Sequence, residues 1–237
     1  MPSPGAYDAS AYLKNNLVKF LQAGLTKEAK RQGSLTNTAI YNACKISMVN
    51  LSRSYRGQAG STANFSMVIK DKLYFVNTGD SRAMVILPTG VRQITEDAKP
   101  GKETYERSIA KRGGNVVRKD KDASPRVDGA LSVARSVGDH YLDGHISARP
   151  KITQVDLCRM LPATAPAGTS VTCHIFHGCD GVFDVASSQQ VGKPIRQGLA
   201  ENKPPLQLVI DAVISSYKSR SSDNLSAMLV PVTYTIT

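Results

Sequence analysis

Residues 62–87 read TANFSMVIKDKLYFVNTGDSRAMVIL, a stretch in which polar links separate three short apolar runs. Apolar, β-branched and aromatic residues dominate these runs, which is typical of β-strands, and the runs cover 62–69, 73–77 and 82–87. The link at 70–72 is too short to cross over a sheet, so the first two runs are predicted to form an antiparallel hairpin. A fourth run at 91–94 extends the pattern into a meander.

Helical periodicity surrounds this meander on both sides. Apolar residues recur every three or four positions in five segments, 9–24, 35–51, 103–112, 188–200 and 206–218. Two further strands are predicted at 171–176 and 225–235. Groups of hairpin-linked strands separated by groups of helices favour an α+β sandwich over a doubly wound parallel sheet. We expect residues 1–237 to form one domain, because this length still suits a single core.

The composition is that of a folded globular protein. The 237 residues are 41% hydrophobic and 21% charged, which excludes a disordered or fibrous chain. The four cysteines form no Cys-x-x-Cys pair, so reduced thiols are expected rather than a zinc site or a disulfide framework. No apolar run reaches the roughly 18 residues of a membrane helix, and the first 30 residues do not resemble a secretory signal. These features predict an intracellular protein, cytoplasmic or nuclear, with no membrane partner.

The formal net charge of +11 is the unusual bulk property. Such a field favours acidic or phosphorylated partners. Nucleic acid is not favoured, because the chain has no long Lys/Arg run and no tryptophan to stack on bases. A solvated basic face is the favoured interpretation of the charge, and a steep loss of binding with salt would be the signature of nucleic-acid recognition.

Four aspartates lie at or near the ends of predicted strands: Asp80, Asp180, Asp184 and Asp223. Glycine beside an aspartate lets the backbone approach a ligand, and converging carboxylates are tolerated when a cation neutralises them. Hard oxygen ligands suit Mg²⁺ or Mn²⁺. Each aspartate taken singly is more typical of a turn than of a metal site.

Six ordered blocks, taken together, resemble the type 2C family of metal-dependent serine/threonine protein phosphatases. The most specific blocks read VNTGDSRA at 76–83, CDGVFDV at 179–185 and SDNLS at 222–226. The other three are residues 60–63, 95–100 and 126–139. The segment 12–17 is similar to the helix that follows the first metal motif of the family.

The resemblance implies a fold of two packed antiparallel sheets flanked by helices. It also implies metal-dependent hydrolysis of phosphoserine and phosphothreonine in a phosphoprotein substrate, with Mg²⁺ or Mn²⁺ as cofactor. By resemblance, Asp180 and Asp223 match ligands of the two-metal centre. Asp80 and Asp184, together with Asp180, match the positions that hold a weaker third metal. No catalytic or substrate-binding residue is assigned, and the substrate, pathway and oligomeric state are not specified by the sequence.

The chain departs from the family pattern near its beginning. The family has an early strand with a phosphate-binding arginine and a Glu-Asp pair, followed by an Asp-Gly-His-Gly-Gly turn whose aspartate bridges the metals. Neither is found, and the turn would fall at residues 2–6, which read PSPGA. We therefore expect an N-terminally truncated domain whose activity is impaired, a pseudophosphatase or scaffold. The alternative is an active phosphatase whose missing ligands come from Asp8, a partner chain or upstream sequence. If Asp8 is not a ligand, we expect it to cap the N-terminus of the first helix.

A cysteine hydrolase is a further alternative, because His177 and Cys179 lie two residues apart in a predicted strand and would share a face. A buried thiol beside a core histidine is the simpler interpretation. His140 and His145 are expected in a surface loop. The basic segment 99–121 lies where a phosphorylated substrate would approach, and a solvated charged helix explains it equally well.

Overall fold

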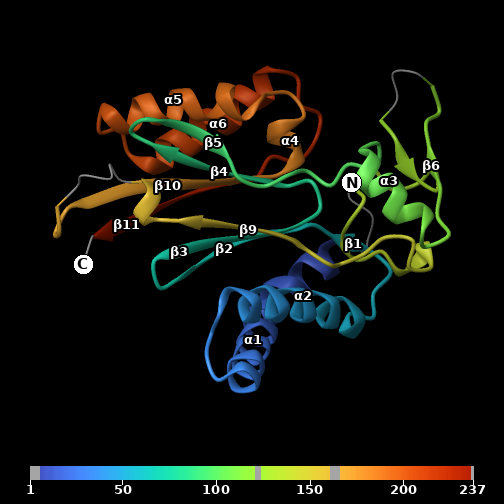
Figure 1. Ribbon diagram of the computed structural model, residues 1–237. Coiled ribbons are helices and arrows are strands. Elements are labelled where there is room, and N and C mark those ends of the chain that lie inside the picture. Colours follow the sequence, from blue (N-terminus) through green and yellow to red (C-terminus); the bar gives the residue numbers. More distant parts are fainter. Residues whose placement is uncertain (1–5, 121–123, 161–165, 236–237) are drawn as a thin grey trace. The chain divides into compact units, whose positions relative to one another are not determined.

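The computed structural model describes residues 6–120, 124–160 and 166–235, and its contacts divide the chain into two compact units. The first unit contains residues 1–63, 76–80 and 97–151. The second unit contains residues 64–75, 81–96 and 152–237. Figure 1 traces both units by residue number.

Two long helices begin the first unit: α1 (Ala6–Gln32) and α2 (Asn37–Ser54), which pack against each other. Thr36 caps α2 by accepting a hydrogen bond from the Ala39 amide at 3.1 Å. α1 is longer than the predicted 9–24 because Gly24 does not end it. A side chain at Gly24 would meet the Ser47 hydroxyl at 2.3 Å, so this glycine permits the close approach of α2.

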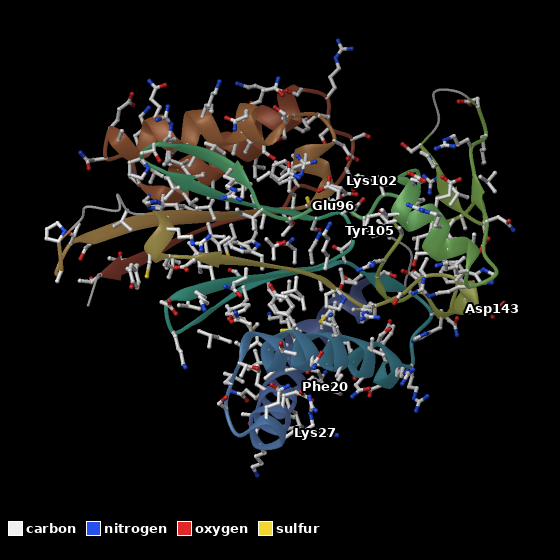
Figure 2. All side chains as sticks on the ribbon, in the orientation of Figure 1. Phe20, Lys27, Glu96, Lys102, Tyr105 and Asp143 are labelled. Carbon is white, nitrogen blue, oxygen red and sulfur yellow. The ribbon has the colours of Figure 1, made fainter. Side chains whose placement is uncertain are left out.

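The rest of the first unit contains α3 (Glu103–Ala110) and two pairs of short strands. β1 (Gly60–Ser61) pairs with β8 (Val137–Gly138), and these two strands contact α1 and α2. β6 (Val116–Val117) pairs with β7 (Arg126–Val127), and β6 contacts α3. A 3-10 turn, η1 (His140–Leu142), follows. Tyr105 and Ile109 of α3 are buried in a cluster with Val127, and the Arg135 guanidinium lies 5.1 Å from the Tyr105 ring. Figure 2 labels Tyr105 on this helix.

A four-stranded antiparallel sheet organises the second unit. Its order is β11 (Ala227–Thr235), β10 (Ser170–Gly178), β4 (Arg82–Leu87) and β5 (Gly90–Gln93). Helices α5 (Ser188–Ala200) and α6 (Pro205–Lys218) lie on one face, as Figure 1 shows, and the short α4 (Asp180–Phe183) precedes them. Phe176, Val191 and Ile195 belong to the core between this sheet and its helices.

A three-stranded sheet with the order β2 (Ala63–Ile69), β3 (Lys72–Thr78) and β9 (Lys151–Asp156) completes the strands, followed by η2 (Cys158–Met160). β2 and β3 are neighbours joined by two residues, which confirms the predicted hairpin. A second core cluster combines Leu73 and Phe75 of β3 with Ile175 of β10. β9 was not predicted, because KITQVD lacks a regular alternation of apolar and polar residues.

The predicted fold class is confirmed as mixed helices and antiparallel sheets, with helices on a sheet face. The predicted helices at 103–112, 188–200 and 206–218 correspond to α3, α5 and α6 within two residues at each end. Within the described residues, no helix combines the length and apolar character needed to cross a bilayer.

Candidate functional site

Asp180 and Asp223 lie at the same edge of the second unit's four-stranded sheet. Gly178, the last residue of β10, pairs with Ala227, the first residue of β11. The Cys179 amide continues the pairing with a 3.0 Å hydrogen bond to the Ser226 carbonyl. The antiparallel register therefore places the residues that follow β10 beside those that precede β11.

Gly181 allows these two loops to touch. A β-carbon at this position would lie 2.4 Å from the Asn224 carbonyl oxygen and 3.3 Å from the Asp223 β-carbon. The Ser221 hydroxyl also donates a 2.7 Å hydrogen bond to the Gly181 carbonyl. The absence of a side chain at 181 thus brings the backbones of Asp180 and Asp223 together.

Each aspartate of this edge has local backbone partners. The Asp180 carboxylate accepts from the Gly181 amide at 2.9 Å, and the Asp223 carboxylate accepts from the Asn224 amide at 2.6 Å. Asp184 ends α4, where its amide donates to the Asp180 carbonyl at 2.7 Å. Asp184 and Asp223 are exposed, and Asp180 is half-buried. This open edge, defined by Asp180, Asp184 and Asp223, presents carboxylates to solvent.

Arg82 begins β4 at the same end of this sheet, where it pairs with Gly178. Its guanidinium lies 4.4 Å from the centre of the Phe183 ring and donates to the Ser188 hydroxyl at 3.2 Å. Cation–π contact and hydrogen bonding both orient this positive charge. The neighbourhood of the open edge is therefore of mixed charge.

The open edge fits a divalent cation only in part. Carboxylate oxygens are ligands that Mg²⁺ and Mn²⁺ prefer, and two of the loops that carry them touch. However, in the part of the chain that the structure describes, Asp180, Asp184 and Asp223 are not a trio with ligand atoms within 4.8 Å of one another. These three residues therefore do not form a ready-made three-ligand site for a single ion.

Asp80 in the first unit is a different kind of aspartate. Its side chain is 1% exposed and forms a 2.6 Å ion pair with the Lys99 ammonium. The preceding Gly79 has a φ of 116°, and its carbonyl accepts from the Ala98 amide at 3.0 Å, which brings the segment of Lys99 beside Asp80. The Lys99 ammonium therefore neutralises this carboxylate in the structure.

Lys99 is the residue that sequence reasoning missed at Asp80. It was included in a solvated basic segment, and its side chain is in fact only one-third exposed. The sequence did contain a signal for this contact: Lys99 lies in the block 95–100, which directly follows the Asp80 block in the order of the family motifs.

Asp8 can be placed only by its backbone, which lies in the first turn of α1. Residues 2–5, where the family turn would fall, lie outside the described residues. The roles predicted for Asp8 as a metal ligand or at the helix N-terminus stay predictions.

The structure does not join His177 and Cys179 as a catalytic pair. The His177 ring contacts Asn64 through Nδ1 and the Ser66 hydroxyl through Nε2, the latter at 3.1 Å, and burial lowers the pKa of His177 to about 4. The Cys179 thiol instead donates to the Asn224 carbonyl at 3.1 Å. The cysteine-hydrolase hypothesis therefore lacks the histidine–thiol contact that it needs.

The two loop histidines are both held by other groups. His145 Nδ1 lies 2.7 Å from the Asp128 carboxylate, and this hydrogen bond lowers the pKa of Asp128. His140 is exposed, and its Nε2 lies 3.1 Å from the Tyr55 carbonyl. His140 is exposed as expected but begins the 3-10 turn η1, and His145 lies in a loop and is half-buried.

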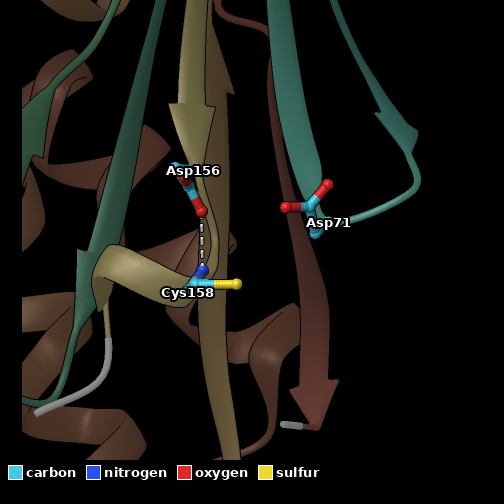
Figure 3. Close-up of side chains that lie close together, drawn as sticks. All are labelled: Asp71, Asp156 and Cys158. Atoms are coloured by element: carbon cyan, nitrogen blue, oxygen red, sulfur yellow. Dashed lines mark hydrogen bonds between the residues drawn. The ribbon is translucent and has the colours of Figure 1, made fainter. Parts of the chain in front are cut away.

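A different group of potential ligands lies where β2 joins β3 and where β9 ends. The ligand atoms of Asp71, Asp156 and Cys158 all lie within 4.8 Å of one another, the one such trio in the described ranges (Figure 3). The Cys158 amide donates to Asp156 at 3.0 Å, and its thiol lies 2.9 Å from the Tyr234 hydroxyl. The hydrogen bond with Cys158 is the main cause that raises the pKa of Tyr234 to about 12, and burial and the charges of Asp71 and Asp156 act in the same direction. Nothing in the sequence analysis singled out this trio, which is brought together only by the fold.

Comparison with known proteins identifies the relatives of this chain. The family model described as protein phosphatase 2C matches residues 3–225. The probable protein phosphatases 2C 58 and 2C 20 of Arabidopsis thaliana are each 31% identical to it, over 92% of this chain and 73% and 71% of their own lengths.

Solved structures show the same fold. A C. elegans sex-determining protein has a TM-score of 0.74 at 20% identity, and the match covers 95% of this chain and 53% of that protein. The serine-threonine phosphatase 2C of Toxoplasma gondii has a TM-score of 0.66 at 21% identity, covering 93% and 80%. Since the family model spans most of the sequence and a curated relative shares 31% identity, the chain belongs to the protein phosphatase 2C family.

Proposed function

We propose that this chain binds phosphoproteins with its phosphatase fold and hydrolyses them weakly or not at all. The observation that carries the proposal is that the 237 residues contain no Asp-Gly-His-Gly-Gly sequence. Two-metal hydrolysis depends on holding two cations about 3.5–4 Å apart, where they activate water and stabilise the attacking and leaving oxygens. Without a bridging carboxylate, the open edge offers at most one weakly held Mg²⁺ or Mn²⁺.

The ion pair of Asp80 and Lys99 supports the same proposal. By resemblance, Asp80 would be a ligand of a weak third metal, but its buried carboxylate already has a cation at 2.6 Å. A metal would have to displace the Lys99 ammonium and replace the Coulomb energy of this pair.

An active Mg²⁺- or Mn²⁺-dependent phosphatase is the second candidate. It is favoured by the placement of Asp180 and Asp223 on touching loops with exposed or half-exposed carboxylates. In this case Asp8, a partner chain or upstream sequence supplies the remaining ligands, and residues 1–237 act as one phosphatase domain.

The proposed location is the cytoplasm or nucleus. All four cysteines are free, and Cys44 and Cys173 are buried, where desolvation raises the pKa of both thiols. Free, inert thiols suit a reducing compartment. The proposed partners are phosphorylated proteins.

The proposal is tested by measuring binding and hydrolysis of one fluorescent phosphothreonine peptide across a Mn²⁺ titration. The wild-type chain is compared with Asp180→Asn and with Asp211→Asn, a matched change of an exposed aspartate on α6. The proposal expects binding that exceeds that of the unphosphorylated peptide, with hydrolysis no faster in wild type than in Asp180→Asn. Metal-dependent turnover that is lost only in Asp180→Asn would establish the active phosphatase instead. A folded chain that does not distinguish the two peptides would refute phosphoprotein binding.

A further inference from the structure

A cavity of about 640 Å³ lies in the second unit, between the helix-bearing face of the four-stranded sheet and the C-terminal half of α5. Its apolar lining comes from the end of β4 and the turn after it, and from the last turn of α5: Ile86, Leu87, Pro88, Leu199 and Ala200. This volume is within the range of pockets that bind small molecules or a few peptide side chains.

The polar groups of the cavity are cationic or neutral. Lys193 and Arg196 of α5 line it together with His174 of β10, and no aspartate or glutamate is among its lining residues. The Arg196 guanidinium donates to the Pro88 carbonyl at 3.0 Å, which fixes one end of the group over the cavity. Within the described ranges, neither the Lys193 side chain nor the His174 side chain has a hydrogen-bond or ion-pair partner. The two positive charges therefore have no carboxylate counter-ion in the cavity.

This cavity is separate from the open edge. His174 lies four residues before the end of β10, and Thr172 lies six residues before it. At 3.3 Å per strand residue, six residues correspond to about 20 Å along the sheet. A ligand in the cavity would therefore not contact Asp180 or Asp223.

We propose that this cavity binds an acidic segment of another protein, with a carboxylate side chain against Lys193 and Arg196 and an apolar side chain against Pro88 and Leu199. Charge complementarity predicts the anionic part of the ligand, because the cavity contains two cationic side chains and an imidazole but no carboxylate. The apolar lining identifies the second part, because burying a leucine-sized side chain there contributes the non-electrostatic affinity. The site is independent of whether the chain hydrolyses phosphoproteins.

The first test is fluorescence polarisation with a labelled hexapeptide that alternates glutamate and leucine. Lys193→Glu is the informative variant, because this exposed side chain has no partner to lose within the described residues. Lys27→Glu makes the same charge change at an exposed lysine on α1, outside the cavity. We expect Lys193→Glu to weaken binding at least about tenfold, because the change places a carboxylate against the carboxylate of the peptide. Lys27→Glu is expected to weaken binding less than twofold.

Three outcomes overturn the proposal. Equal losses in Lys193→Glu and Lys27→Glu would show a response to net charge alone, and equal binding by all three proteins would exclude the cavity. A second hexapeptide that alternates glutamate and serine tests the apolar wall: the proposal predicts at least tenfold weaker binding, and equal affinity contradicts it. Circular dichroism of each variant verifies that the fold is kept.

Discussion

Asp80 and Asp223 belong to family-like sequence blocks, yet the fold gives them opposite environments. Asp80 is 1% exposed and pairs with the Lys99 ammonium at 2.6 Å. Asp223 is exposed, and its carboxylate accepts from the adjoining Asn224 amide. A buried carboxylate with a fixed counter-ion serves stability, whereas an exposed carboxylate on a loop is free to bind a cation. The same residue type therefore predicts different consequences of mutation in the two units.

The largest effect is expected for Lys99→Met. This change leaves the buried Asp80 carboxylate without the Lys99 ammonium, which costs on the order of 3 kcal/mol. Asp80→Asn should cost less, because the remaining Lys99 side chain is one-third exposed and can reach water. Urea denaturation measures both values, with Lys27→Met as the exposed-lysine control. Equal and small losses, below about 0.5 kcal/mol, would show that the ion pair is not structural.

His177 extends the comparison to a buried polar group of the second unit. Its pKa is lowered to about 4 by burial, so the unfolded chain, with a histidine pKa near 6.5, binds more protons between these values. The free energy of unfolding therefore falls as the pH falls from about 6.5 to 4, by on the order of 2–3 kcal/mol. His177→Gln should flatten this dependence in urea titrations at a series of pH values. An unchanged slope in the variant would assign the dependence to other groups.

Gly181→Ala tests whether the open edge depends on close backbone contact. The new β-carbon would lie 2.4 Å from the Asn224 carbonyl oxygen, so the loops must separate, at a cost of about 1–3 kcal/mol. Gly90→Ala is the matched control, since nothing lies within 4 Å of a β-carbon there and its φ is not positive. In thermal unfolding, the melting temperature of Gly181→Ala should be lower than that of Gly90→Ala. Equal melting temperatures would contradict the contact between the two loops.

The smallest effect on stability is expected for Asp223→Asn. The exposed amide still accepts the Asn224 hydrogen bond, so the free energy of unfolding should change by less than about 0.5 kcal/mol. A cation bound at the open edge of the wild type raises the melting temperature by mass action, and this increment should be lost in the variant. A Mn²⁺-dependent increment that persists in Asp223→Asn would place the bound cation elsewhere.

Local pattern predicted much of the fold, and its failures have local causes. The hairpin of β2 and β3 and the helices α5 and α6 follow from periodicity and short links. α1 extends beyond Gly24 because tertiary packing against α2 overrides the low helix propensity of glycine. β9 has no regular alternation, so only its pairing with β3 identifies it as a strand.

The candidate site was predictable as residue types but not as an arrangement. The blocks CDGVFDV at 179–185 and SDNLS at 222–226 indicated Asp180 and Asp223, and the pairing of β10 with β11 explains why they lie at one edge. The Lys99 partner of Asp80 and the trio of Asp71, Asp156 and Cys158 depend on contacts between distant segments. Sequence spacing contains no direct signal for such contacts.

The number of Mn²⁺ ions bound at equilibrium tests the central claim most directly. Electron paramagnetic resonance of free Mn²⁺, measured over a titration of the wild-type chain and of Asp180→Asn, gives this number and the affinity. We expect at most one ion per chain, bound in the millimolar range and lost in Asp180→Asn. Two ions bound with micromolar affinity by the wild type would show a complete two-metal centre and would contradict the proposed weak or absent hydrolysis.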